Sequence, residues 1–443
     1  VFNSMFMNIG NSISMKNSSE CRYVMMLKSI FDRELFPNDF DTWTVQKQCV
    51  WINENIATFF PNVPKSLLDL IPASFRQGNY SRSLMEIPEW LDVDKYRRGQ
   101  KFVRENYTSL LISKILGIMH VYSFEEALRP IIISKRSHTP YLGFKRYSST
   151  IQRFFNWYNG EPWIEGTPAY KDMQFARRMH LMIQEKMHKL DNVQINNESK
   201  IAELWCPDRK FFLKDFTAAC PLEQHGQRPY IIIDKSPYKP KGMNNADMAG
   251  IQCSFISLIL LCPEKIGVHN ATNEDMEAFC HMWRCYGHYL GMENEHNFCR
   301  GSLDEIKQRT RDLYQYWIVP NFKDVTPEWE HMTRCLVEPL NYYPWIYMPY
   351  KVMALLAMDT LNISMTHLYT SMNYAEWITY KSWRFLLCYV LKFSIFRAVI
   401  NKMIRKIFDQ AINFSPEKEA KLQEKSKKQL SHFSIIKNET RLH

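Results

Sequence analysis

The run from Ala249 to Cys262 constrains the fold more than any other part of the chain. It reads AGIQCSFISLILLC, is largely apolar and contains no charged residue. With 14 residues it is too short to cross the hydrocarbon core of a membrane as a helix, which takes about 20 residues. The run therefore predicts a helix buried in the core of a folded domain.

Composition indicates what surrounds this helix. The 443 residues, 46% of them hydrophobic and 14% aromatic, suffice for one large domain with appendages or for two domains. Only 14 glycines occur, which argues against a sheet-rich fold with many tight turns and against phosphate-cradling loops. We expect an all-α protein, with a single large helical domain from residue 41 to residue 380.

Local patterns divide the remaining chain. A long amphipathic helix is predicted from about Asp94, because Ile112, Leu116 and Met119 share one apolar stripe. The polar residues 191–240 contain five prolines and one short strand-like run at 230–234, and predict a surface excursion, with a lid over the site as its candidate role. The N-terminal segment 1–40 is predicted to be poorly ordered.

The candidate chemistry lies between residues 146 and 180. Arg146 and Thr150 stand four residues apart and so share one face of a helix. An interruption rich in Gly, Pro and Trp separates them from a second helical run, which ends in Arg177, Arg178, Met179 and His180. A polar pair that faces one imidazole among aromatic side chains is expected of a haem pocket, with the imidazole for iron and cations for the propionates.

Two other interpretations compete with this one. A lone histidine on an apolar helix is usually a hydrogen-bonded core residue, and the arginines beside it can be ordinary surface charges. A second set of histidines, His281, His288 and His296, lies further along the chain. His281 and His288 share a helix face and could hold a metal, but no HExxH motif occurs there, and we expect this face to be structural.

The spacing of these residues resembles that of a known family. The pattern Arg-x-x-x-Thr, with His180 thirty residues after Thr150, resembles the rubber oxygenase (latex clearing protein) family and its mpaB-like, endoplasmic-reticulum-bound relatives. An Asn-x-x-Asp-hydrophobic-Ala motif that begins at Asn244 and a Trp-Arg-x-x-Gly-x-x-Leu-Gly motif that begins at Trp283 follow in the family's order. The resemblance covers residues 95–300, about half of the chain.

The resemblance implies a fold and a chemistry. It implies an all-helical domain that encloses a haem b pocket and uses dioxygen to cleave or oxidise a carbon–carbon double bond of an isoprenoid or other unsaturated lipid. His180 would be the iron ligand, Arg146 and Thr150 would line the oxygen side, and Arg177 and Asp247 would contact the cofactor with Arg146. A location at a membrane, in the endoplasmic reticulum, is also implied.

The chain departs from the rubber-cleaving members at two positions. Some of them have a distal lysine ligand just before the threonine, where this chain has Ser149. Their catalytic glutamate falls, by spacing, on Pro130, so Glu125 and Glu126 are the nearest candidates for a general base. These departures favour an unsaturated lipid over a rubber polymer as substrate. A haem- or lipid-binding protein without turnover is the alternative function, and a membrane-surface scaffold without a cofactor is a third.

The positive charge is concentrated in the C-terminal part. Residues 381–443 contain 14 Lys or Arg and five Asp or Glu, a net charge of +9 out of +10 for the whole chain. This distribution favours an anionic membrane surface over nucleic acid as a partner. Residues 381–412 predict a basic, interfacial amphipathic helix, with a terminal helix docked on the core as the alternative. Residues 413–443, which begin with a helix start at Ser415 and Pro416, predict a Lys-rich tail that is solvated or disordered.

Overall fold

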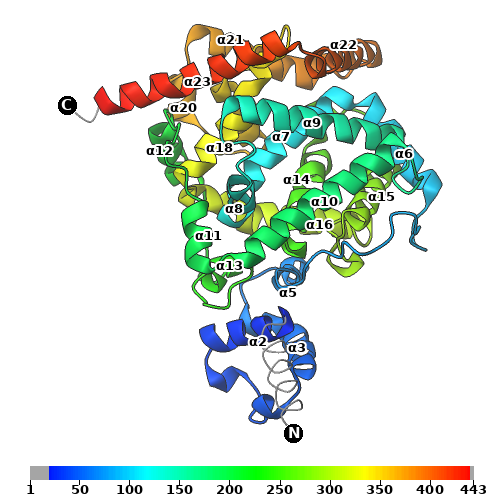
Figure 1. Ribbon diagram of the computed structural model, residues 1–443, viewed down its shortest axis with the longest axis vertical. Helices are drawn as coiled ribbons and strands as arrows, with labels where there is room; N and C mark the ends of the chain where they lie inside the picture. Colours follow the sequence, from blue (N-terminus) through cyan, green and yellow to red (C-terminus); the bar gives the residue numbers. More distant parts are fainter. Residues whose placement is uncertain (1–18, 440–443) are drawn as a thin grey trace.

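The computed structural model describes residues 19–439, with side chains described up to residue 431, and every regular element in this part of the chain is helical. The prediction of an all-α fold in a single large domain is confirmed. Figure 1 shows a small N-terminal group of helices at one end, a large central bundle, and a layer of C-terminal helices at the opposite end.

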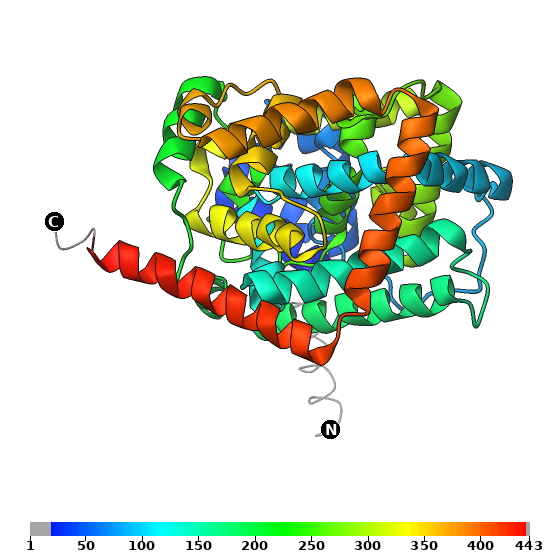
Figure 2. The ribbon, with the colours of Figure 1, turned by 90° about the horizontal axis from the view of Figure 1, so that it is seen from above.

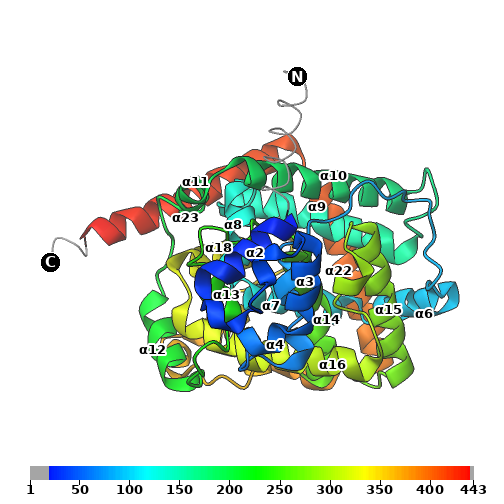
Figure 3. The ribbon, with the colours of Figure 1, turned by 90° about the horizontal axis from the view of Figure 1, so that it is seen from below.

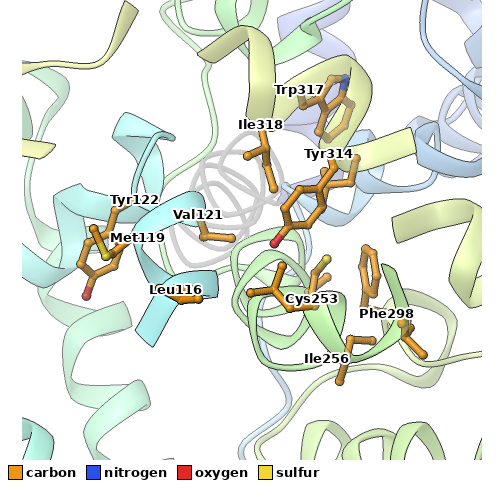
Figure 4. Packing of buried hydrophobic residues seen from close by; sticks show 14 of the residues in the cluster. Leu116, Met119, Val121, Tyr122, Cys253, Ile256, Phe298, Tyr314, Trp317 and Ile318 are labelled. Carbon is orange, nitrogen blue, oxygen red and sulfur yellow. The ribbon is translucent and has the colours of Figure 1, made fainter. Parts of the chain in front are cut away.

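The central bundle is built around the apolar helix α14 (Asn245–Leu261), which is buried as predicted. Helix α7 crosses it closely: a Cβ atom at Gly117 would lie 1.9 Å from the carbonyl oxygen of Ser254, so only glycine permits this approach. Figure 4 shows α14 side chains such as Cys253 and Ile256 among the buried residues of this core. The other helices of the bundle are α6 (Val93–Glu105), α7 (Tyr107–Val121), α8 (Glu125–Ile133), α9 (Pro140–Asn159), α10 (Pro168–Lys189), α15 (Asn273–Tyr289) and α16 (Leu303–Asp312).

The helix expected from Asp94 onwards is in fact two helices, α6 and α7, which meet at Asn106. The Asn106 side chain donates a hydrogen bond to the carbonyl oxygen of Phe102 at 3.0 Å. Asparagine competes in this way with the backbone hydrogen bonds of a helix. The apolar stripe therefore continues across a break that periodicity alone does not reveal.

Helices α9 and α10 pack against one another and begin in the same way. The hydroxyls of Thr139 and Thr167 accept hydrogen bonds from the backbone N–H groups of Leu142 and Tyr170. Each threonine is followed by a proline, which needs no hydrogen-bond partner at the first helical position. These starts fix where along the two helices the candidate site residues fall.

The N-terminal part is ordered from Ser19 onwards, so the prediction of a poorly ordered segment is wrong for residues 19–40, whereas residues 1–18 lie outside the described part. Met26 and Leu27 are fully buried, and Arg22 donates a hydrogen bond to the carbonyl oxygen of Lys239 at 2.8 Å. Figure 3 shows this group in front of the bundle. Its helices are α2 (Ser19–Ile30), α3 (Val45–Glu54), α4 (Ile56–Phe59) and α5 (Leu70–Ala73).

Residues 191–240 are not a surface excursion. Their helix α12 buries Phe212 and Phe216 completely, and the strand-like run forms the short helix α13 instead. A buried ion cluster holds the segment, because Asp208 pairs with Arg334, which also pairs with Glu330 at 3.0 Å. The helices of this region and of the chain that follows the bundle are α11 (Asn192–Glu198), α12 (Arg209–Ala219), α13 (Pro229–Ile233), the π-helical turn η6 (Leu313–Ile318), α17 (Val319–Asn321), α18 (Pro327–Val337), α19 (Tyr350–Thr360) and α20 (Thr366–Thr370).

The C-terminal helices form an outer layer, which Figure 2 shows in front of the bundle. Residues 381–412 do not form one helix: α21 (Tyr374–Phe385) passes into a π-helical turn, η9 (Leu386–Val390), and a new helix, α22 (Ser394–Ile412), follows. The predicted tail is a helix, α23 (Pro416–Glu439), which starts at the proline as expected. The hydroxyl of Ser426 is buried and accepts a hydrogen bond from Tyr141 N, so the first half of α23 is docked. No helix within residues 19–439 is long and apolar enough to cross a membrane.

Candidate functional site

A cavity lies between α7, α8, α9, α10, α14 and α15. Its free volume is about 1760 Å³, including the part that is open to solvent. Aromatic and aliphatic side chains form most of its wall, and its charged or titratable groups are Arg136, Arg146, Arg153, His180 and Asp247 together with Tyr122 and Tyr147. Arg146, Thr150, His180 and Asp247, all predicted from the sequence, therefore meet in one cavity although they come from three helices.

His180 presents a polar atom that nothing satisfies. Its Nδ1 atom is buried and has no hydrogen-bond partner among the described residues. Burial, and after it the positive charge of Arg146, lowers the pKa of His180 to about 4. The imidazole is therefore neutral at physiological pH, which is the form that binds a metal. A buried nitrogen without a hydrogen-bond partner destabilises the folded state unless a ligand binds to it.

Arg146 and Thr150 lie on the face of α9 that lines the cavity. Arg146 donates a hydrogen bond to the Ser137 hydroxyl at 3.0 Å and forms no ion pair with any carboxylate in residues 19–431. Its charge is thus available to an anionic ligand. The Thr150 hydroxyl donates to the carbonyl oxygen of Arg146 at 3.0 Å, so its proton is already used within the helix.

Two further arginines, which the sequence reasoning missed, extend this positive lining. Arg153 follows Arg146 by seven residues, two helical turns, and the spacing 146, 150 and 153 is the signal that could have revealed it. Its guanidinium lies 4.1 Å above the Phe175 ring and 3.7 Å from Asp172. Arg136 comes from the loop before α9. Asp247 is the one carboxylate in the wall as described, so the cavity carries a net positive charge.

Asp247 has a structural role and an unusual pKa. It is the third residue of α14 and completes a capping box: Asn244 N donates to Asp247 Oδ2 at 3.2 Å, and Asp247 N donates to Asn244 Oδ1 at 2.9 Å. Burial raises the pKa of Asp247 to about 7, although hydrogen bonds from the backbone of Asn244 and Met243 oppose the shift. The Asn-x-x-Asp motif is therefore explained as a helix start whose carboxyl lies at the cavity.

A second cavity adjoins the first, with a free volume of about 1070 Å³ including the part that is open to solvent, and Ala127 and Asp247 line both. Glu126 lies in this second cavity, where burial raises the pKa of its carboxyl, an effect that Arg129 opposes. Glu125 is exposed and pairs with Arg129 at 3.3 Å. The structure thus brings Glu126 near Asp247, but neither glutamate lines the cavity of His180.

Arg177 does not line the cavity either. Its guanidinium donates hydrogen bonds at 2.6 Å to the carbonyl oxygens of Tyr80 and Arg82. These bonds attach the loop before α6 to α10. In this arrangement Arg177 cannot make the contact with the cofactor that was expected of it. The arginines that line the cavity beside Arg146 are Arg136 and Arg153.

The motif that begins at Trp283 serves packing around the cavity. The Trp283 ring is part of the wall. A Cβ atom at Gly287 would lie 2.8 Å from the side-chain nitrogens of Asn297 and Gln252, and Gln252 in turn donates to the carbonyl oxygen of Trp283 at 2.7 Å. The glycine therefore allows α14 and α15 to approach closely enough to place the tryptophan.

Lys114 of α7 lies behind this wall, and the sequence reasoning also missed it. It is buried, and its ammonium has no hydrogen-bond partner among the described residues. The rings of Phe154, Tyr158 and Trp283 surround it at 5.0, 4.6 and 5.7 Å. Burial lowers the pKa of Lys114 to about 7. A single lysine in the apolar run around residue 114 was the signal in the sequence.

The three histidines of the competing set lie against separate groups. His281 Nε2 lies 3.1 Å from the carbonyl oxygen of Asp92, and His288 Nδ1 lies 3.2 Å from a guanidinium nitrogen of Arg82. His296 lies 3.3 Å from the carboxylate of its neighbour Glu295. In the part of the chain that the structure describes, no three His, Cys, Asp or Glu side chains form a group that could hold a metal ion.

The fold and the site together define a class: a single-domain, all-helical protein with a large apolar cavity whose wall contains a neutral histidine and three arginines. Comparison of the chain with protein-family models, with curated proteins and with solved structures found no match.

Proposed function

We propose that the protein binds haem b in the cavity of His180 and oxidises or cleaves a carbon–carbon double bond of an isoprenoid or other unsaturated lipid with dioxygen. One observation carries this proposal. His180 offers a neutral imidazole with an unsatisfied buried nitrogen, in an apolar cavity whose wall holds three arginines and one carboxylate. Iron and carboxylate groups on one planar apolar molecule would satisfy these features together.

The residues present fit haem b. His180 would be the iron ligand, since its pKa of about 4 leaves the imidazole unprotonated. Arg146, which has no carboxylate partner among the described residues, and Arg136 would hold the propionates, because guanidinium groups bind carboxylates in a two-pronged geometry. Bound haem supplies the iron chemistry that activates dioxygen.

The protein's own contribution is to position the alkene and to exclude water. Phe154, Phe255 and Trp283 pack edge to face and tilted against one another in the wall, with ring centroids 4.9–5.8 Å apart. An apolar substrate loses unfavourable contact with water when it enters such a wall. Asp247, with a pKa near 7, can take up or release a proton at the boundary with the second cavity.

A haem- or lipid-binding protein without turnover is the second candidate, and two observations favour it. Pro130, at the position of the family's catalytic glutamate, lines the cavity and offers no titratable group. The Thr150 hydroxyl donates to the Arg146 carbonyl oxygen, so it must leave that bond before it can donate to dioxygen. Oxygen uptake in the presence of an isoprenoid alkene such as squalene separates the two candidates.

The test is an absorption spectrum of the purified protein, before and after titration with haemin and with dithionite, for the wild type and for His180→Ala. We expect a Soret band that the substitution abolishes or shifts. His188→Ala is the matched control, because His188 lies on the same helix outside the cavity wall and contacts Gln77 at 3.2 Å. A protein that takes up no haemin, or an unchanged spectrum of His180→Ala, would overturn the proposal.

A further inference from the structure

Large hydrophobic side chains are exposed along the end of α21, the turn η9 and α22, and we call this set the α21–α22 face. Two pairs of its rings are neighbours, Phe385 with Tyr389 at 5.6 Å and Phe393 with Phe396 at 6.1 Å between centroids. Ile395, Tyr389 and Phe393 are 75%, 63% and 61% exposed. Soluble proteins seldom leave such a group uncovered without a partner. The apolar members of the face are Phe385, Tyr389, Phe393, Ile395, Phe396, Val399 and Met403.

The packing of α22 on the bundle fixes which of its sides faces outward. Asn401 is buried and accepts hydrogen bonds from the backbone and hydroxyl of Thr108 at 3.0 and 2.8 Å. It also donates to the carbonyl oxygen of Glu105 at 2.9 Å. Ile395, Val399 and Met403 follow one another at intervals of four residues, so they form a row on the opposite side of the helix. The exposure of this row is therefore built into the fold.

The charges of the face have one sign. Residues 377–408 contain seven Lys or Arg and no Asp or Glu. Lys392, Lys402 and Lys406 are exposed and form no ion pair within residues 19–431. Lys402 and Lys406 lie beside the apolar row of α22, since they share its i, i+4 spacing. Such a surface complements an anionic partner that also accepts apolar side chains.

We propose that the α21–α22 face docks in the plane of an anionic phospholipid membrane. Basic helices with Phe, Ile and Val on the inserted side bind at the boundary between headgroups and acyl chains, and lysines near a negatively charged leaflet add electrostatic attraction. α21 and α22 lie at the outer end of the molecule in Figure 1 and in front of the bundle in Figure 2. The bundle therefore does not cover these two helices on their outer side.

The experiment is co-sedimentation of the full chain with two kinds of vesicle. One contains phosphatidylcholine alone, and the other also contains about 30% phosphatidylserine, which gives it a negative surface potential. We expect binding to the anionic vesicles, and weaker binding as salt rises. Lys402→Gln with Lys406→Gln should lower the partition coefficient about 30-fold, since each lysine near the surface contributes about fivefold. Ile395→Ser with Val399→Ser and Met403→Ser should abolish binding.

Two matched controls test the position of these residues rather than their type. Lys210 and Lys214 are exposed on α12 with the same spacing of four residues, and their replacement by Gln should leave binding unchanged. Leu222→Ser removes an apolar side chain that is 92% exposed elsewhere. Circular dichroism should show that each variant is folded. A wild type that stays in the supernatant, variants that bind equally well, or a dimer that the serine variant dissociates would each overturn the proposal.

Discussion

Burial and the nearby charge of Arg146 together hold the pKa of His180 at about 4, although the two residues come from different helices. The charge of Arg146 therefore helps to keep the imidazole neutral. Both residues are in the state that haem binding requires. The imidazole has a free lone pair for iron, and the guanidinium has a positive charge for a carboxylate.

Replacement of Arg146 by Met should change both properties. The pKa of His180 should rise above about 4, because one of its two causes is removed, and haemin should bind about tenfold more weakly without the charged hydrogen bond to a carboxylate. NMR titration of the histidine Cε1–H signal and haemin titration measure the two effects. Arg146→Lys is the control, which should retain most of the pKa shift. Equal haemin affinity in all three proteins would contradict the assignment.

Asp247 should make stability fall as pH rises. Its pKa is raised from 3.8 to about 7 in the folded state, so the folded protein binds the extra proton between these values. The stabilising contribution is complete below pH 3.8 and is lost as pH rises through 7. Between pH 5 and pH 8 the unfolding free energy of the wild type should decrease by about 3 kcal/mol through this group, and Asp247→Asn should remove that decrease in urea denaturation.

Asp275 is the matched control for that experiment, because it occupies the same position in the capping box of α15. Burial raises the pKa of Asp275, but hydrogen bonds from Thr272 and Arg98 outweigh this effect and lower the pKa overall. Its contribution is therefore present above pH 4 and lost on acidification, the opposite sign. If both asparagine variants shift stability in the same direction with pH, the account of Asp247 is wrong.

Lys114 should destabilise the protein at neutral pH. Its pKa falls from 10.5 to about 7 on burial, so the unfolded chain binds the extra proton between these values and stability rises with pH across that window. Lys114→Met should raise the unfolding free energy at pH 7 by about 1–4 kcal/mol, because an unpaired buried charge is replaced by an apolar side chain of similar length. Lys101→Met, on the exposed side of α6, should have little effect. A destabilised Lys114→Met protein would show that the aromatic contacts outweigh the cost of burial.

Arg334 should be indispensable for the folded state. It lies between the carboxylates of Asp208 and Glu330 in the core, and its removal leaves the buried Glu330 without a cation and Asp208 with Lys351 alone, 3.7 Å away. Arg334→Met should lower the unfolding free energy by about 3–5 kcal/mol in urea denaturation. Its ion pairs with three carboxylates, Asp208, Glu330 and Glu338, distinguish it from Arg311, an exposed arginine of α16 whose replacement should cost less than 1 kcal/mol. A small effect at Arg334 would mean that water or relaxation compensates the cluster.

The sequence predicted those parts of the fold that depend on periodicity and on helix starts. The apolar run around residue 255 predicted the buried helix α14, and Ser415 with Pro416 predicted the start of α23, because a helix start is a local feature of the sequence. The break at Asn106 was missed, since the apolar stripe continues through it. The burial of Phe212 and Phe216 was missed because the residues around them are polar. The interaction that holds this segment is the pair of Asp208 with Arg334, which lies more than 100 residues away in the sequence.

The candidate site was predicted in part for a similar reason. Arg146 and Thr150 share one face by helical spacing alone, and the length of the segment between α9 and α10 lets His180 reach the same cavity. Arg177 and Glu125 were expected at the site but do not line the cavity. The rotation of each helix about its own axis decides whether such a residue faces the cavity or a neighbouring loop. That rotation is set by distant contacts, such as the carbonyl oxygens of residues 80 and 82.

Helix α9 separates the two surfaces to which functions are proposed. On its outer side, the Arg405 guanidinium of α22 lies 4.4 Å above the Phe155 ring, whereas its inner side carries Arg146 and Thr150 into the cavity. If the α21–α22 face rests on a bilayer, α22 and α9 both lie between the acyl chains and the histidine, a distance of two helix diameters or about 20 Å.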